Sequence, residues 1–206
     1  MQTFDLVIKG GDAILPGHGR TTCDIAIRAG KIAAILAPDE LTTALQEVSA
    51  RGLVVMPGAV DVHLHLGHGK DIARPREPAD ADRETAAAVK GGVTTFVPYL
   101  MATEPFETIF DDAVAVTERG ARIDFGYHFI ISTEAQLAGV AAYIRDYGVP
   151  TFKIFMNNRG GEGARLGLPE STMASCFDCA KQPRKAVAWC VRTRKRSRSP
   201  GCCVTG

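Results

Sequence analysis

The stretch PGAVDVHLHLGHG, residues 57–69, places three histidines within six positions, directly after an apolar run. Side chains alternate between the two faces of a β-strand, so Asp61, His63 and His65 share one face. Two imidazoles on one face can bind a single metal ion, and a nearby carboxylate can orient such a ligand. The same spacing also fits a hydrogen-bonded histidine pair in a polar interior, so it leaves both interpretations open.

Helices and apolar strands alternate after this stretch, which is typical of a parallel sheet covered by helices. A first strand at 59–66 is followed by expected strands at 93–100, 123–131 and 149–156, and by expected helices at 80–92, 105–120 and 132–148. This pattern predicts an α/β fold, namely a partial TIM-type (β/α) barrel. Barrel enzymes carry out their chemistry at the carboxyl ends of the strands, where His63 and His65 would lie.

A small β module is predicted ahead of the barrel, over residues 1–56, and we expect it to be a β-sandwich. The segment DLVIKGGDAIL, residues 5–15, predicts two strands around a glycine turn, and CDIAIRAGKIAAIL, residues 23–36, predicts a hairpin. The first half of the barrel would then occupy residues 57–170, and a separate tail residues 171–206.

Lys153 is the second unusual residue, because it lies within the apolar strand GVPTFKIFM. A buried ammonium must be paired or lose its charge, unless the side chain extends to solvent. The chemical alternative is carbamylation by carbon dioxide, which makes an anionic ligand able to bridge two metal ions. His128 is expected to line the core or a pocket, and His68 lies in a glycine-rich loop beyond the histidine strand.

Three segments, VMPGAVDVHLHLG, AAAVKGGVTTFVPYL and GVPTFKIFM, together resemble the cyclic amidohydrolases. This family contains hydantoinase and dihydropyrimidinase, with allantoinase and dihydroorotase as cousins. The resemblance implies two divalent metal ions, usually zinc, and a metal-bound hydroxide that attacks the carbonyl of a cyclic amide. It assigns His63 and His65 as metal ligands and Lys153, carbamylated, as the bridge between the ions. Asp61 would support the ligands from behind.

The expected substrate is a small cyclic amide or imide. Dihydroorotases usually place an arginine after the second histidine to hold the substrate carboxylate, whereas this chain has Gly67, which favours a neutral ring of the hydantoin or dihydropyrimidine kind. Hydantoinases place a tyrosine a few residues beyond the lysine, where this chain has Asn157 and Asn158. Asn158 is therefore the candidate substrate contact. A dihydroorotase-like or allantoinase-like hydrolase, and a non-enzymatic homologue acting as an assembly element, remain alternatives.

Composition excludes several other classes of protein. The formal charge of +1 gives no global attraction to nucleic acid or acidic membranes. The amino terminus carries an early acid, Asp5, and no apolar core typical of a signal peptide. No apolar run approaches the roughly 18 residues of a membrane span. We therefore expect a cytoplasmic protein. The resemblance to the cyclic amidohydrolases implies that its full-length relatives are homo-oligomers.

The tail, residues 171–206, holds eight Lys or Arg, one acid and five of the six cysteines, a net charge of +7. A zinc module built on Cys176 and Cys179, with Cys190, Cys202 and Cys203, is one interpretation. A nucleic-acid-binding arm formed by RTRKRSRS is another. We favour a shifted reading frame, because a shift of one nucleotide permits an amphipathic helix and an apolar strand ending in a histidine. The tail would then be disordered.

The family takes two further metal-binding histidines and a catalytic aspartate from later barrel strands. No histidine follows His128 in this sequence. Since a barrel closes with eight strands, the resemblance implies a chain truncated after about half its barrel, and weakly active or inactive on its own.

Overall fold

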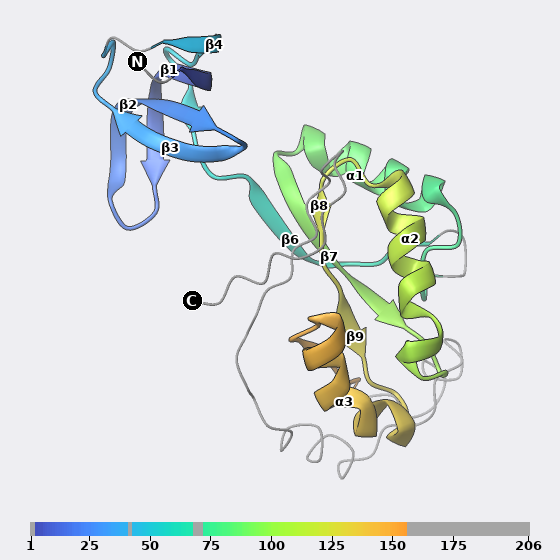
Figure 1. Cartoon of the computed structure of the whole chain (residues 1–206). Coiled ribbons are helices and arrows are strands. Elements are labelled where there is room, and N and C mark those ends of the chain that lie inside the picture. The colour runs from blue at the N-terminus through green and yellow to red at the C-terminus, as the bar shows by residue number, and fades with distance from the viewer. Residues whose placement is uncertain (1–2, 41–42, 68–71, 156–206) are drawn as a thin grey trace. The chain divides into compact units, whose positions relative to one another are not determined.

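The computed structural model describes residues 3–40, 43–67 and 72–155. The chain divides into two compact units, Met1–Gly58 and Ala59–Gly206, and each is described by itself (Figure 1). The expectations for His68, for Asn157 and Asn158, and for the tail concern residues outside the described ranges.

The first unit is a mixed five-stranded sheet in which β3, β2, β1 and β4 are neighbours in that order and β5 pairs with β1. Its strands are β1 (Phe4–Leu15), β2 (Gly19–Arg28), β3 (Lys31–Leu36), β4 (Ala44–Ser49) and β5 (Val54–Val55). The hairpin predicted over 23–36 is confirmed by antiparallel pairing of β2 with β3. A small core of Ala13, Cys23 and Ile25 is buried on this sheet.

Residues 5–15 form one strand, so the prediction of two strands around a glycine turn is wrong. The ladder between β1 and β2 shifts register between Ile8 and Gly11, which makes the glycine pair a β-bulge. Gly10 has a φ of +67°, a conformation that glycine adopts without steric cost. Its N–H donates a hydrogen bond of 2.7 Å to the buried carboxylate of Asp24 on β2. The neighbouring strand therefore stabilises a bulge where the local sequence suggested a turn.

The second unit is a parallel sheet in the order β10, β9, β7 and β6, with β8 pairing with β7. Its strands are β6 (Ala59–Leu64), β7 (Val93–Met101), β8 (Asp124–Phe125), β9 (His128–Ile130) and β10 (Phe152–Lys153). The connecting elements are α1 (Pro78–Lys90), the 3-10 helix η1 (Phe106–Thr108), α2 (Phe110–Gly120) and α3 (Glu134–Tyr147). Parallel neighbours joined in chain order through helices confirm the predicted partial barrel. Its third strand is interrupted between β8 and β9.

Side-chain alternation along β7 separates two faces of this sheet. Phe96 and Leu100 belong to the main core beneath the helices, where Phe106 stacks on Phe129 with ring centroids 4.0 Å apart. On the opposite face, Met101 and Ile130 are buried, with Tyr99 and Phe155 packed against them. The second face is the interior of the half-barrel. His63 of β6, His65 just beyond that strand and Lys153 of β10 lie on this face.

Close backbone contact joins α1 and α2. A Cβ placed on Gly120 would lie 1.8 Å from the carbonyl oxygen of Pro78, so only glycine fits at the end of α2. Just beyond it, the Arg122 N–H donates to Thr85 Oγ1 at 3.1 Å, and the Arg122 guanidinium pairs with Asp82 at 2.7 Å. The two helices are thereby fixed against each other.

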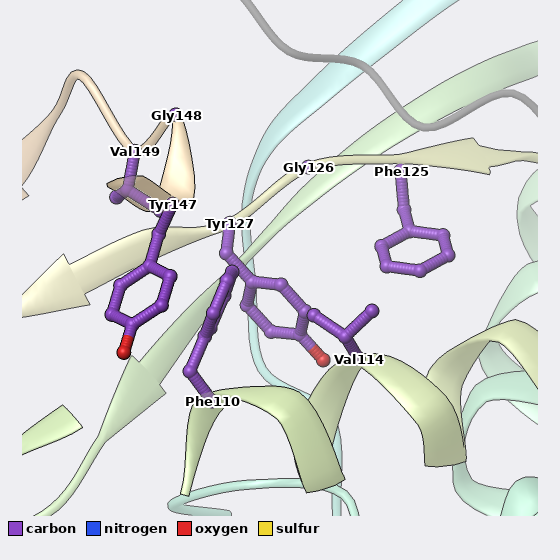
Figure 2. Close-up of a pocket in the computed structure, with 8 residues that line it drawn as sticks. All are labelled: Phe110, Val114, Phe125, Gly126, Tyr127, Tyr147, Gly148 and Val149. Atoms are coloured by element: carbon purple, nitrogen blue, oxygen red, sulfur yellow. The ribbon is translucent and has the colours of Figure 1, made fainter. Parts of the chain in front are cut away.

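A small recess lies on the helix side of the sheet (Figure 2). Four aromatic side chains line it together with four small or aliphatic residues: Phe110, Phe125, Tyr127 and Tyr147, with Val114, Gly126, Gly148 and Val149. Its volume of about 20 Å³ has room for roughly one water molecule. The recess is therefore too small for a cyclic amide. None of the helices within the described ranges combines the length and hydropathy needed to cross a bilayer.

Candidate functional site

The histidine pair lies at the carboxyl end of β6, with His63 in the strand and His65 just beyond its last residue, Leu64. The Asp61 carboxylate accepts a hydrogen bond of 3.0 Å from the backbone N–H of His63, so it braces the strand rather than an imidazole. The ladder between β6 and β7 shifts register between Asp61 and Leu64. Irregular ladders of this kind re-aim side chains next to active sites, and here the irregularity spans His63. His63 is exposed and His65 is half-buried.

Lys153, at the end of β10, lies beside His63. Its Nζ is 3.5 Å from Nε2 of His63, although the two residues are 90 positions apart in the sequence. Lys153 is the register partner of Ile130 on β9, which is buried on the barrel-interior face. The structure therefore brings His63 and Lys153 together on one face, from strands separated in the sheet by β7 and β9.

Tyr99 on β7 completes the cluster, and the sequence analysis did not single it out. Its ring centroid lies 5.0 Å from that of His63, 5.6 Å from that of His65 and 5.0 Å from that of His128. Lys153 Nζ lies 4.4 Å from the same centroid. The alternation of side chains along VTTFVPYL could have identified Tyr99, because residues two positions apart on a strand lie on the same face, and Met101 lies on the barrel-interior face.

No protein-family model matches this chain. An allantoinase of Escherichia coli strain K12 is 33% identical over 176 residues, which cover 78% of this chain and 34% of the allantoinase. A crystal structure of D-hydantoinase matches with a TM-score of 0.63 and 27% identity, over 75% of this chain and 34% of that chain.

The sequence of this chain is similar to that of a cyclic amidohydrolase, and its fold matches that of another. An L-hydantoinase (dihydropyrimidinase) from Arthrobacter aurescens shares the fold, with a TM-score of 0.68 at 24% identity, over 86% of this chain and 38% of that chain. The chain spans about a third of the length of the curated relatives it matches.

Burial and neighbouring charge shift the pKa values of several groups in the candidate site. Burial lowers the pKa of His65, the nearby Lys153 and His63 lower it further, and a hydrogen bond with the backbone of Ile72 opposes them. Burial lowers the pKa of His128, and His63 adds to the effect. Burial also lowers the pKa of Lys153. The shifts favour neutral imidazoles, the form that ligates a metal.

Several features of the histidine pair fit a metal ion. Nδ1 of His65 is buried and finds no hydrogen-bond partner among the described residues. Because a Zn–N bond is about 2.0–2.1 Å, the ring centroids of two ligating imidazoles lie at most about 6.5 Å apart. The centroids of His63 and His65 are 6.3 Å apart, near that limit. The rings would need to close by about 1 Å to ligate one ion tetrahedrally.

The described residues supply only part of a complete ligand set. Within them, no cluster of three or more His, Cys, Asp or Glu side chains could hold a metal. His128 is buried, its Nδ1 is hydrogen-bonded to Thr151 Oγ1, and its ring faces Tyr99. His128 is therefore a buried residue beside Tyr99, which agrees with the expected core position. The chemistry available in this part of the chain consists of two imidazoles and one amine.

Proposed function

We propose that this chain carries one half of the active site of a metal-dependent hydrolase that opens cyclic amides at a C–N bond, of the hydantoinase or dihydropyrimidinase kind. The observation that supports the proposal is the convergence of His63, His65 and Lys153 on the barrel-interior face. The similarity to an allantoinase and to a D-hydantoinase supports the reaction class, and the shared position of these side chains supports the proposed site.

His63 and His65 would hold one divalent ion, which we propose to be zinc. Lys153 would bridge to a second ion after carbamylation, in which its neutral amine forms an N–C bond to carbon dioxide and releases one proton. Bound divalent ions supply Lewis acidity and activate water toward an amide carbonyl near neutral pH. The lowered pKa of Lys153 favours the neutral amine that this reaction requires.

The proposed substrate is a small neutral cyclic amide or imide. Dihydroorotases have an arginine that binds the substrate carboxylate at the position where this chain has Gly67, so we propose a ring without a carboxylate. Asn158 is proposed as a substrate contact. An allantoinase-like activity is the second candidate, because a curated allantoinase is 33% identical to this chain. A cytoplasmic location and homo-oligomeric full-length relatives stay predictions.

Metal content of the purified chain tests the proposal. After dialysis against zinc and bicarbonate, mass spectrometry of bound metal should find at least one zinc per chain in the wild type. His63→Ala and His65→Ala should each lose it, since a single remaining imidazole and a lysine hold an ion weakly. His18→Ala, which removes an exposed histidine of the first unit, is the matched control and should keep the zinc. Equal zinc content in all four proteins would contradict the assignment.

A further inference from the structure

We infer that Tyr99 is a positioning residue of this site, whose ring contacts the imidazoles of His63 and His65 and the amine of Lys153 and fixes their orientations relative to one another. The inference rests on the proposed function. It concerns a residue that neither the histidine spacing nor the strand lysine indicates.

The Tyr99 ring touches both histidines in different ways. The ring of His63 meets it edge-on, with an interplanar angle of 76°, whereas the ring of His65 is tilted by 33°. Aromatic pairs attract at centroid separations of about 4.5–7 Å, and both pairs lie within that range. Because one rigid ring contacts both imidazoles, it limits the rotation of each and the angle between them.

The same ring also limits the position of Lys153. Nζ lies 4.4 Å from the Tyr99 centroid and 4.7 Å from the Phe155 centroid. Both distances fall within the roughly 6 Å over which a cation is attracted to an aromatic face. Nε2 of His63 lies 3.5 Å from Nζ. The amine therefore contacts the Tyr99 ring, the Phe155 ring and the His63 imidazole. Tyr99 is the residue that contacts all three proposed ligands.

Tyr99 is itself supported from the next strand. It is the register partner of His128 on β9, and the two rings lie 5.0 Å apart with an interplanar angle of 32°. His128 is only 7% exposed, and its Nδ1 is hydrogen-bonded to Thr151. A buried, hydrogen-bonded imidazole therefore stands against the Tyr99 ring, and the neighbouring core residues Met101 and Ile130 pack beside it. These contacts involve the ring of Tyr99 and not its hydroxyl.

Substitutions that separate the ring from the hydroxyl test this inference. In the full chain, Tyr99→Phe keeps the ring, and Tyr99→Leu and Tyr99→Met remove it. Tyr147→Leu, the same substitution on the helix side of the sheet, is the matched control. Three quantities would be measured: zinc affinity by competition with a chromogenic chelator, the absorption spectrum of bound cobalt(II), and the ring ¹H–¹³C chemical shifts of His63 and His65 without metal. Circular dichroism melting checks folding.

Residues that orient metal ligands from behind typically contribute about 10–100-fold to metal affinity. Tyr99→Leu and Tyr99→Met should therefore lose about that much zinc affinity, alter the cobalt spectrum and lose the ring-current shifts of both histidines. Tyr99→Phe should stay within about threefold of wild-type affinity, and Tyr147→Leu should match wild type. The methionine variant, similar in length, replaces the leucine variant if the latter melts early.

Each remaining outcome is decisive. Wild-type zinc affinity and wild-type histidine shifts in Tyr99→Leu would overturn the role of the ring and leave the proposed metal site standing. A wild type that binds no zinc would contradict the proposed function. In that case, the metal-free histidine shifts still decide whether Tyr99 orients the imidazoles.

Discussion

The Lys153 amine and the His63 imidazole share a contact of 3.5 Å between Nζ and Nε2. When Lys153 carries its proton, the ammonium can only donate, and Nε2 of His63 is then the acceptor. The lone pair that faces Lys153 is the same one that a metal ion would use. The proposed metal binding at His63 and the proposed carbamylation of Lys153 would therefore be coupled through one pair of atoms.

This relationship predicts that zinc binding depends on bicarbonate. In the wild type, bicarbonate should raise zinc affinity by about tenfold or more, because a carbamate is anionic and ligates whereas an ammonium repels the ion. In Lys153→Ala the dependence should vanish. Isothermal titration with and without bicarbonate measures both. Lys9→Ala, which removes a lysine from the first unit, should behave as wild type, and a Lys153→Ala chain that still responds to bicarbonate would contradict the bridge.

The histidines on the barrel-interior face also predict how stability depends on pH. The pKa values of His65 and His128 are lowered in the folded chain, mainly by burial. Below about pH 6.5 the unfolded chain then binds more protons than the folded chain, so the free energy of unfolding falls as the pH falls. Urea unfolding at several pH values between about 5 and 8 measures this.

A variant isolates the contribution of one histidine. His128→Gln should show a shallower loss of stability between about pH 6.5 and pH 5, because one group whose pKa differs between the two states is gone. His18→Gln, in an exposed turn, should keep the wild-type slope. Identical slopes for His128→Gln and wild type would mean that His128 titrates alike in both states.

Much of the fold could be predicted from the sequence, because the spacing of apolar residues indicates which face of each strand or helix is buried. The barrel strands were located through their apolar runs, and His63, His65 and Lys153 through chemically unusual residues in such runs. The glycine bulge in β1 was missed, since it depends on pairing with β2 and on Asp24, which is remote in sequence. Tyr99 was missed because an aromatic residue in an apolar strand looks like ordinary core until its neighbours are known.

The contact between α1 and α2 gives a prediction about stability alone. Gly120→Ala should destabilise the second unit by about 1–3 kcal/mol, the usual cost of forcing an atom into a filled space, because the added Cβ meets the Pro78 carbonyl. Gly91→Ala is the matched control. Its Cβ would lie 3.4 Å from the nearest atom, the Ala88 carbonyl oxygen, and the change should have little effect. Urea unfolding followed by circular dichroism compares the two, and equal midpoints would show that the helices shift apart freely.

The final prediction concerns activity. The described residues offer two imidazoles and one lysine, and the Asp61 carboxylate is engaged by the His63 backbone. A second ion would therefore lack ligands, and no described carboxylate is placed to take a proton from the attacking water. Loss of a general base alone typically costs about 10²–10⁴-fold. We expect the purified 206-residue chain, given zinc and bicarbonate, to open neither hydantoin nor dihydrouracil above background.

We predict that an extended protein, which continues after residue 170 in the alternative reading frame and adds the later barrel strands that the family resemblance implies, opens the ring, because those strands would supply further metal ligands and the base. Absorbance assays of ring opening on both proteins make the comparison, and Lys153→Ala in the extended protein should abolish the recovered activity. Clear turnover by the 206-residue chain that disappears in Lys153→Ala would show that the second half of the barrel is dispensable. The ligand count argues against that outcome, since two imidazoles and a carbamate leave a pair of tetrahedral ions short of donors.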